Sequence, residues 1–406
     1  MERAELARRL GGRLERGADV SAVLVREADP GRFQSAFAAA VAGGSAVFLG
    51  DPGWTAAQRD EASAIVARAQ RRGLGANETE RGWLMIPTGG TSGRLTFARH
   101  DSETIAAAVT GFTRHFDVGQ VNAINVLPLH HVSGLMAWMR CILTAGTFNT
   151  WNWAQLQAGE RPVITRGAWV ISLVPTQLER LLRVPAAVEW LRGFTVIFLG
   201  GGPVWPDLAD RAAAAGLPIA LSYGMTETAA MVTALRPAEF LAGSRSSGRA
   251  LPHMRVSVGS DDRVRVEGES VFRGYWPGWS DEPALVTNDL GRLDERGELH
   301  VLGRRDAVII TGGKKVFPGE VEAALRASGE FDDVIVLGVP DSEWGEQVVA
   351  FYPERSAGGP LNRQRAEGGL AAFQRPKRYV AVADWPRNAQ GKVNRAALRA
   401  MVGRVD

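Results

Sequence analysis

Apolar residues along the first hundred positions recur with two periods, which predict helices and strands in turn. In residues 55–72 the apolar positions fall on one helical face: Ala62, Ile65, Val66 and Ala69. The short apolar runs 45–49 and 83–86 are typical of strands, and the turn 50–53 follows the first of them. Because helices that alternate with strands are typical of a parallel sheet, this part of the chain is predicted to be α/β.

The same alternation continues to about residue 221, and several of the predicted strands end in small polar residues. A helix is predicted over 102–116 and a strand over 122–129. Three further strands are predicted, each followed by a turn rich in small or polar residues: 169–174, 194–199 and 218–221. Ligand crevices of open α/β sheets lie at the carboxyl ends of their strands. The turns after these strands are therefore expected to meet around one ligand.

Period-two alternation between residues 247 and 276 predicts a small β lobe, and a second unit follows it. Beyond residue 303 we expect a helix over 318–327 and a strand over 334–339, in an α+β unit of about a hundred residues. The predicted boundary divides the chain into residues 1–303 and 304–406.

Composition narrows the range of partners. With 47 basic and 44 acidic residues, the formal charge of +3 is too close to balance to indicate nucleic acid. The single cysteine excludes an internal disulfide framework and favours a reducing compartment. Neither a signal peptide nor an apolar run long enough to span a membrane is found in the sequence. A cytoplasmic enzyme that acts on small molecules is expected, with a homodimer as one option for its assembly.

A loop of glycines and hydroxyl residues follows the predicted strand 83–86. It contains Thr88, Gly89, Gly90, Thr91, Ser92 and Gly93. Closely spaced backbone N–H groups and small hydroxyls suit a polyphosphate, although ordinary turns use the same residues. Arg94 and Leu95 stand where the Walker sequence requires Lys and then Ser or Thr, so this is not an ordinary P-loop.

Five further motifs follow the loop in order. They are SYGMTET (222–228), TND (287–289), GRRD (303–306), GGKKVFPGEVE (312–322) and NAQGKVNR (388–395). Together with the glycine loop they resemble the ordered core motifs of the adenylate-forming superfamily, which contains acyl-CoA synthetases and AMP-binding enzymes. The resemblance implies a large amino-terminal α/β domain with a small β lobe, shortened at its start. A small, mobile α+β carboxyl-terminal domain would follow.

The resemblance also implies the substrates ATP and coenzyme A (CoA), with Mg²⁺ as cofactor. Residues assigned to the nucleotide are Thr88 to Gly93, Gly200, Gly201, Gly202, Tyr223, Gly224, Met225, Asp289, Arg304 and Lys392. Thr226 would contact the α-phosphate, Glu227 would hold Mg²⁺, and Lys392 would neutralise charge during adenylation. Members of the superfamily commonly end the glycine loop in a lysine. Thr96 occupies that position here, so the loop is expected to be less electropositive or to use Arg94.

In the carboxyl-terminal domain the resemblance implies a hinge at Asp306 and a CoA contact at Gly312, Gly313 and Lys314. Other basic residues could meet CoA phosphates or simply form a solvated face: Lys315, Arg375, Lys377 and Arg378.

His131 matches the superfamily's histidine beside the acyl pocket, and Ser133, Thr176 and Gln177 would make one end of that pocket polar. Successive side chains of an extended chain face opposite ways, so His130 and His131 are not expected to share one site. We therefore expect His130 to be a packed or solvent-facing ring and no transition-metal site to be present.

Four segments are most like the superfamily's ligase for an aryl acid with two carboxylates, one activated and one that stays charged. These segments are 86–93, 127–135, 172–182 and 385–395. Three alternatives stay open: a CoA ligase for another aryl or acyl acid, a non-catalytic nucleotide- or acyl-CoA-binding regulator, and an adenylating enzyme that loads a carrier protein.

Overall fold

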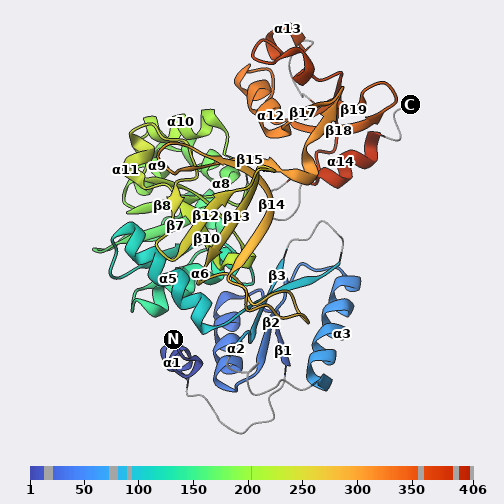
Figure 1. Ribbon diagram of the computed structural model, residues 1–406. Helices are drawn as coiled ribbons and strands as arrows, with labels where there is room; N and C mark the ends of the chain where they lie inside the picture. Colours follow the sequence, from blue (N-terminus) through green and yellow to red (C-terminus); the bar gives the residue numbers. More distant parts are fainter. Residues whose placement is uncertain are drawn as a thin grey trace.

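A computed structural model describes residues 1–12, 22–72, 81–88, 94–202, 204–354, 361–386 and 393–402. Four β-sheets organise these residues (Figure 1). Two sheets belong to α/β layers, one forms a small lobe without helices of its own, and one lies in the carboxyl-terminal part. A short helix, α1 (Arg3–Arg9), precedes the first sheet.

The first sheet has the strand order β1-β2-β3-β4. Its strands are β1 (Ala22–Val25), β2 (Ala46–Leu49), β3 (Leu84–Thr88) and β4 (Thr96–His100). The first three are parallel and β4 is antiparallel to β3. Successive residues of β2 point to opposite faces of the sheet. Val47 packs in the core that contains helix α2 (Pro30–Ala42), and Phe48 packs in the core that contains helix α3 (Ala56–Arg72). The sheet is therefore covered on both faces, as the lower part of Figure 1 shows.

The second sheet has the order β11-β10-β9-β8-β7-β5-β6. Its strands are β5 (Asn122–Asn125), β6 (Phe148–Thr150), β7 (Trp169–Leu173), β8 (Val196–Leu199), β9 (Ile219–Met225), β10 (Ala230–Ala234) and β11 (Arg249–Ala250). Strands β5 to β9 are mutually parallel, whereas β10 and β11 run antiparallel. The carboxyl ends of the parallel strands therefore share one edge.

Helices cover both faces of the second sheet. They are α5 (Ser102–Phe116), α6 (Val132–Leu143), α7 (Trp153–Gln157), α8 (Pro175–Leu182), α9 (Pro185–Arg192), α10 (Pro206–Ala214) and α11 (Pro237–Leu241). Alternation along β8 again divides two cores: Ile197 packs in the core that contains Leu178 of α8, and Phe198 in the core that contains Phe112 of α5.

The small lobe is an antiparallel sheet of β12 (Met254–Val258), β13 (Arg263–Gly268), β14 (Ala284–Leu293) and β15 (Leu299–Arg304). The single turn η2 (Arg305–Ala307) leads from it into the last sheet. That sheet consists of β16 (Ile309–Thr311), β17 (Lys314–Val316), β18 (Ile335–Asp341), β19 (Gly345–Pro353) and β20 (Arg378–Val382). The carboxyl-terminal part also contains α12 (Pro318–Ala327), α13 (Arg363–Ala366), η3 (Ala372–Gln374) and α14 (Arg395–Val402).

The predicted fold class is confirmed: a large α/β part with a small β lobe precedes a smaller α+β part. Two predicted strands are wrong in length: β9 continues to Met225 rather than ending at 221, and β5 ends at Asn125 rather than continuing to 129. The Asn125 amide donates to the carbonyl of Leu127 at 2.7 Å, and this local bond turns the chain out of the sheet. The boundary between residues 303 and 304 stays a prediction.

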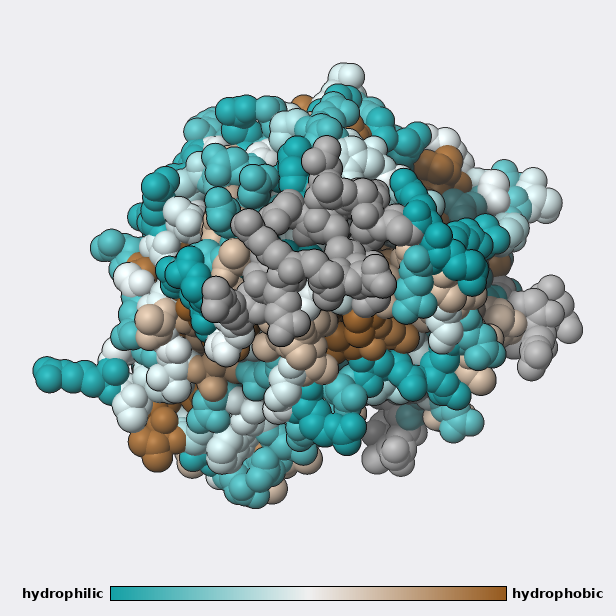
Figure 2. Space-filling view, turned by 90° about the horizontal axis from the view of Figure 1, so that it is seen from below, coloured by the Kyte–Doolittle hydropathy of each residue, from teal (hydrophilic) through white to brown (hydrophobic). Residues whose placement is uncertain are grey.

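Figure 2 views the molecule from the end that carries the first sheet. Hydrophilic residues cover most of the described surface on this face, and apolar residues gather in small groups. Among the helices of the described residues, none is long and apolar enough to cross a membrane.

A buried ion pair joins the start of α5 to the segment that follows the small-lobe strand β13. Asp101 is fully buried, and its carboxylate accepts a hydrogen bond from Arg273 Nε at 2.9 Å and from the backbone N–H of Thr104 at 3.0 Å. Burial alone would raise the pKa of Asp101. The hydrogen bonds and charge of Arg273, with the Thr104 N–H, outweigh this and hold the pKa below its usual value.

We predict that Asp101→Asn destabilises the fold by about 2–3 kcal/mol at pH 7, because asparagine keeps the helix cap but loses the charge. A lowered folded-state pKa gives stability that is present above the unfolded pKa of about 3.9 and is lost as the pH falls through the folded pKa. Urea unfolding at several pH values should therefore show the difference between wild type and variant constant from pH 7 to 5 and shrinking below about pH 4.

Glu103→Gln is the matched control, since this carboxylate binds the same Arg273 at 2.8 Å but is 58% exposed. Its loss should cost at most about 1 kcal/mol. An Asp101→Asn difference that did not shrink in acid would contradict the electrostatic explanation.

Candidate active site

The ends of strands from the two α/β sheets lie near each other, and several of the predicted site residues are on or directly after these strand ends. Thr88 ends β3, Gly200 follows β8, and Tyr223 to Met225 end β9. Contacts between the turn η1 (Thr226–Thr228) and both β3 and β4 bring the two sheets together. The strand ends after which the sequence predicts ligand-binding turns therefore lie close together, and the binding of a ligand there stays a prediction.

Only the base of the predicted phosphate loop can be described, because Gly89, Gly90, Thr91, Ser92 and Gly93 lie outside the described residues. Thr88 and Thr96 face each other across the β3–β4 pair, and their hydroxyl oxygens lie 2.5 Å apart. Thr96, which replaces the superfamily's lysine, thus closes the base of the loop. Arg94 is exposed beside it.

The residues predicted for the adenosine part of ATP are brought together from different strands. The hydroxyl of Tyr223 donates to Asp289 Oδ2 at 2.7 Å, and Arg304 lies opposite Asp289 in the β14–β15 pair. A guanidinium nitrogen of Arg304 is 4.0 Å from Asp289 Oδ1. Burial and the charge of Asp289 raise the pKa of Tyr223 above its usual range, so the phenol stays protonated and remains a donor.

The glycines assigned to the nucleotide have different structural needs. Gly201 has a φ of +76°, which favours glycine, and a side chain at Gly202 would meet nothing within 4 Å. A Cβ at Gly224 would lie 1.7 Å from the carbonyl oxygen of Ala230. Gly224 is therefore required by the close approach of β9 and β10, whatever else it contacts.

The turn that carries Thr226 and Glu227 is held from two sides. The ring of His100 is completely buried and its Nε2 lies 2.7 Å from the Thr226 carbonyl, so this nitrogen donates the hydrogen bond. Burial lowers the pKa of His100 to about 4, so the ring is neutral at pH 7. On the other side, Tyr275 donates to Glu227 Oε1 at 2.5 Å. Tyr275 was missed by sequence reasoning, since it stands 48 positions from its partner.

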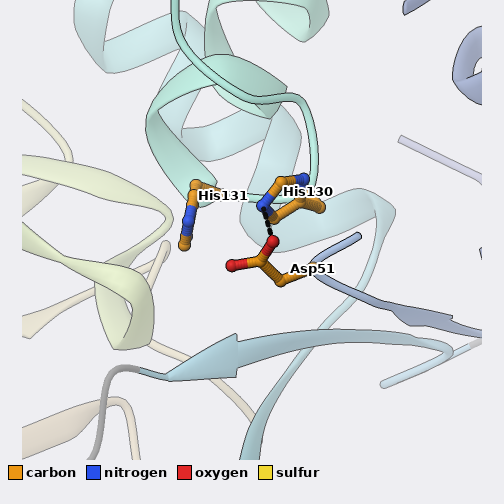
Figure 3. Close-up of side chains that lie close together, drawn as sticks. All are labelled: Asp51, His130 and His131. Carbon is orange, nitrogen blue, oxygen red and sulfur yellow. Dashed lines mark ion pairs between the residues drawn. The ribbon is translucent and has the colours of Figure 1, made fainter. Parts of the chain in front are cut away.

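His130 is packed in the interior, as expected, but the expectation that the two adjacent histidines point to different sites is wrong. The chain turns at Leu129 and His130 instead of remaining extended, so the rings of His130 and His131 lie 4.5 Å apart between centroids. Figure 3 shows both rings above the carboxylate of Asp51, which follows β2 in the other sheet. Gly134 allows this turn to pack on α6, because a Cβ there would lie 2.3 Å from the Pro128 carbonyl oxygen.

The residues predicted to line the acid pocket lie at the starts of two helices. Ser133 is in the first turn of α6, and Thr176 and Gln177 are in the first turn of α8; all three are half-buried. The side-chain oxygen of Gln177 accepts from the Val174 N–H at 3.0 Å. Capping of α8 therefore accounts for one of the polar groups of Gln177.

A buried cation was also missed. Arg140 is 3% exposed, its guanidinium lies 4.3 Å from the ring centroid of Phe112, and its Nε has no hydrogen-bond partner among the described residues. None of the ion pairs found among those residues involves it. Burial lowers the pKa of Arg140 to about 10, which still leaves it charged at pH 7. Arg140 lies seven positions after Ser133, on the same face of α6.

Arg304 and Asp306 are directly joined at the predicted hinge. Arg304 donates to Asp306 through Nε at 3.1 Å and through a terminal nitrogen at 3.0 Å. These hydrogen bonds hold the pKa of Asp306 below its usual value and raise that of Arg304. The same guanidinium thus faces the predicted ribose carboxylate and the predicted hinge carboxylate.

The predicted CoA segment forms the β16–β17 turn, where Gly312 and Gly313 have φ values of +54° and +74°. Lys314 Nζ lies 4.7 Å above the ring of Phe373. Lys315 Nζ is 3.7 Å from Asp262 of the small lobe, so this turn lies against the larger part of the molecule. Of the remaining basic residues, Lys377 Nζ lies 4.9 Å from the ring of Trp344.

Lys392 lies outside the described residues, but the chain that follows it is firmly anchored. Arg395 donates to both oxygens of Glu322 at 2.8 and 3.1 Å, and Glu322 is completely buried. The N–H of Asn394 donates to the carbonyl of Pro386 at 2.8 Å. The described segments on the two sides of the lysine motif are thereby joined to each other and to α12.

Comparisons with known proteins agree with this arrangement. The model of the "AMP-binding enzyme" family matches residues 18–276, and that of the "AMP-binding enzyme C-terminal domain" matches residues 320–392. The chain therefore belongs to the AMP-binding enzyme family, and the resemblance to adenylate-forming enzymes is confirmed.

Relatives within the family carry a more specific name. A 2-succinylbenzoate–CoA ligase of Listeria monocytogenes is 30% identical over 79% of this chain and 70% of its own length. An o-succinylbenzoate CoA synthetase structure from Bacillus subtilis, in complex with an acyl-adenylate intermediate, aligns with a TM-score of 0.77 at 22% identity. The alignment covers 98% of the present chain and 91% of the Bacillus subtilis chain. A structure of the same enzyme in complex with ATP and magnesium aligns with a TM-score of 0.77 at 22% identity. This alignment covers 98% of the present chain and 92% of the Bacillus subtilis chain. Both structures support the fold.

Proposed function

We propose that the protein is an ATP-dependent 2-succinylbenzoate–CoA ligase of menaquinone or phylloquinone synthesis, an AMP-forming acid–thiol ligase. The observation that carries the proposal is the similarity, over 79% of the chain, to a relative with that activity in its name. The substrates would be the dicarboxylic acid, ATP and CoA. A cytosolic location and a homodimer stay predictions.

The reaction has two halves. In the first, a carboxylate oxygen of the acid bonds to the α-phosphorus of ATP, and the bond to pyrophosphate breaks. In the second, the CoA sulfur bonds to the acyl carbon and AMP leaves as a stabilised phosphate. Both transition states gather negative charge, so catalysis is mainly positioning and cationic stabilisation.

The nucleotide would lie across the strand ends. Tyr223 would stack on adenine, with Gly200 to Gly202 beside it, and Asp289 and Arg304 would bind the ribose hydroxyls. The Tyr223–Asp289 hydrogen bond supports this assignment, since it places the carboxylate beside the ring on which adenine would stack. The hydroxyl of Thr226 would then face the α-phosphate, with the loop 88–93 around the other phosphates.

Glu227 would hold Mg²⁺. Its carboxylate receives a neutral phenolic hydrogen bond, and among the described residues no ion pair neutralises it, so an oxygen ligand for a hard cation is available. When bound, magnesium neutralises charge on phosphate oxygens. Tyr275 positions the glutamate through its hydroxyl group.

The acid would enter beside His131 and Ser133. Arg140 would meet the second carboxylate, because a buried guanidinium on the Ser133 face of α6 supplies charge where the neighbouring side chains are apolar. A charged hydrogen bond in such surroundings discriminates strongly against a substrate that lacks the carboxylate. Thr176 would add a polar contact at the opposite wall.

Lys392 would stabilise the first transition state as a compact cation on the mobile carboxyl-terminal domain, which would then turn about Asp306. The turn would bring Gly312, Gly313 and Lys314 towards the site for the thiol of CoA. Because the two half-reactions use different parts of this domain, Lys392 must move away from the site before the thioester forms.

The ligase proposal predicts CoA- and ATP-dependent thioester formation with 2-succinylbenzoate, at a kcat/KM well above those for benzoate and medium-chain acids. Product analysis over this panel is the measurement. Preference for another acid would identify a different aryl or acyl ligase. Absence of pyrophosphate release with every acid would instead support a binding protein, and adenylation without CoA-dependent release would support a carrier-loading enzyme.

Arg140→Met should raise the KM for succinylbenzoate about 10- to 100-fold, because a charged hydrogen bond contributes about 1.5–3 kcal/mol. The KM for an acid without the second carboxylate should be unchanged. Arg140→Lys, which keeps the charge, should recover part of the affinity. Equal increases for both acids would contradict a role in recognising the second carboxylate.

Lys392→Ala should lower adenylation about 100- to 1,000-fold, the cost of removing one preorganised charge-stabilising group. Thioester formation from preformed acyl adenylate should be largely retained. ATP–pyrophosphate exchange and single-turnover thioesterification measure the two halves. The control is Arg363→Ala, an equally charged residue of the same domain that lies 5.1 Å from the Tyr379 ring. An equal loss of rate in adenylation and in thioester formation would contradict a role of Lys392 in the first half-reaction alone.

A further inference from the structure

Asp51, His130 and His131 form a cluster, and the proposed ligase reaction gives a role only to His131, beside the acid. Asp51 follows β2 of the first sheet, and the two histidines precede α6 of the second. One potential ligand atom from each residue lies within 4.8 Å of the other two. Figure 3 shows the carboxylate of Asp51 beneath both rings, with one oxygen towards His130 and the other on the side of His131.

His130 supplies the second observation. The residue is 93% buried, and its Nε2 has no hydrogen-bond partner among the described residues. The nearest carboxylate oxygen, Asp51 Oδ1, is 3.4 Å away, which is close enough for attraction but does not satisfy the geometry of a hydrogen bond. Buried polar atoms without partners are rare, because such an atom has lost its hydrogen bonds to water and gained none in return.

We propose that Asp51, His130 and His131 bind one divalent transition-metal ion, with Zn²⁺ as the preferred ion. Two imidazoles and one carboxylate are a ligand set of transition metals, whereas Mg²⁺ and Ca²⁺ prefer oxygen ligands.

The separations are suitable for such an ion. Tetrahedral Zn²⁺ with bonds of about 2.0–2.1 Å places its ligand atoms about 3.4 Å apart. Asp51 and His130 already have this separation at 3.4 Å. Because the three ligand atoms all lie within 4.8 Å of one another, the third must approach by at most about 1.4 Å, a distance that a change of side-chain rotamer can supply.

The surroundings prepare these groups for a cation. The N–H of Gly53 donates to Asp51 Oδ1 at 2.7 Å and orients the carboxylate, as outer partners of metal ligands do. Because Asp51 and His131 are only half-buried, the ion would keep an open coordination position for water or an anionic ligand.

The test is direct metal binding by the full-length protein in the absence of ATP, acid and CoA. Chelator-treated protein is titrated with Co²⁺, followed by its visible absorbance, and the Co²⁺ is then displaced by Zn²⁺. We expect one equivalent to bind in a saturable way. Asp51→Asn and His130→Phe should each weaken binding by more than the roughly 10- to 100-fold that loss of an outer-shell partner costs.

His300→Ala is the matched control, because His300 and Asp294 form a similar pair, 3.0 Å apart, on the small lobe. Its binding should equal that of the wild type. Circular dichroism checks folding, and if His130→Phe does not fold, the more exposed, isosteric Asp51→Asn decides the result. No saturable binding by the wild type, undiminished binding by Asp51→Asn, or equal loss in His300→Ala would overturn the proposal. Ligase activity is not the readout, so this result is independent of the proposed function.

Discussion

The hydrogen bond from His100 to the carbonyl of Thr226 joins the two α/β sheets at the point where the chemistry is expected. His100 ends β4 of the first sheet, and Thr226 begins the turn after β9 of the second. A neutral ring, completely buried, makes this bond insensitive to solvent and to pH changes near neutrality. The residues on the Thr226 turn can therefore be placed accurately relative to Thr88, although they belong to different sheets.

Around this junction, the groups divide into those that are firmly held and those that remain free to exchange partners. The Asp101–Arg273 pair and the Glu322–Arg395 pair each have a buried carboxylate; the first anchors the start of α5 and the second the start of α14. The Arg304 pair is instead half-exposed. Buried pairs that cannot be broken cheaply suit a scaffold, and exposed pairs suit parts that must move.

Much of the fold could be predicted because strand periodicity and strand-end composition are local properties of the sequence. Tyr223 and Asp289 were assigned to the same nucleotide only through the resemblance of their motifs, since no local pattern in the sequence joins residues 66 positions apart. The close histidine pair could not be foreseen, because it depends on a turn set by the Asn125 side chain and on the space at Gly134. Arg140 was overlooked for a similar reason: only the packed structure shows a cation among aromatic rings with no carboxylate bound to it.

The position of Arg304 between two carboxylates has a consequence for motion. Any rotation that carries Asp306 away must first break the two hydrogen bonds it receives, and these are weak because both side chains are about half-exposed. The released guanidinium then has Asp289 as its nearest acidic neighbour, 4.0 Å away. On the proposed assignments, release of a hinge at Asp306 and ribose binding at Asp289 would therefore draw on the same side chain, and each would favour the other.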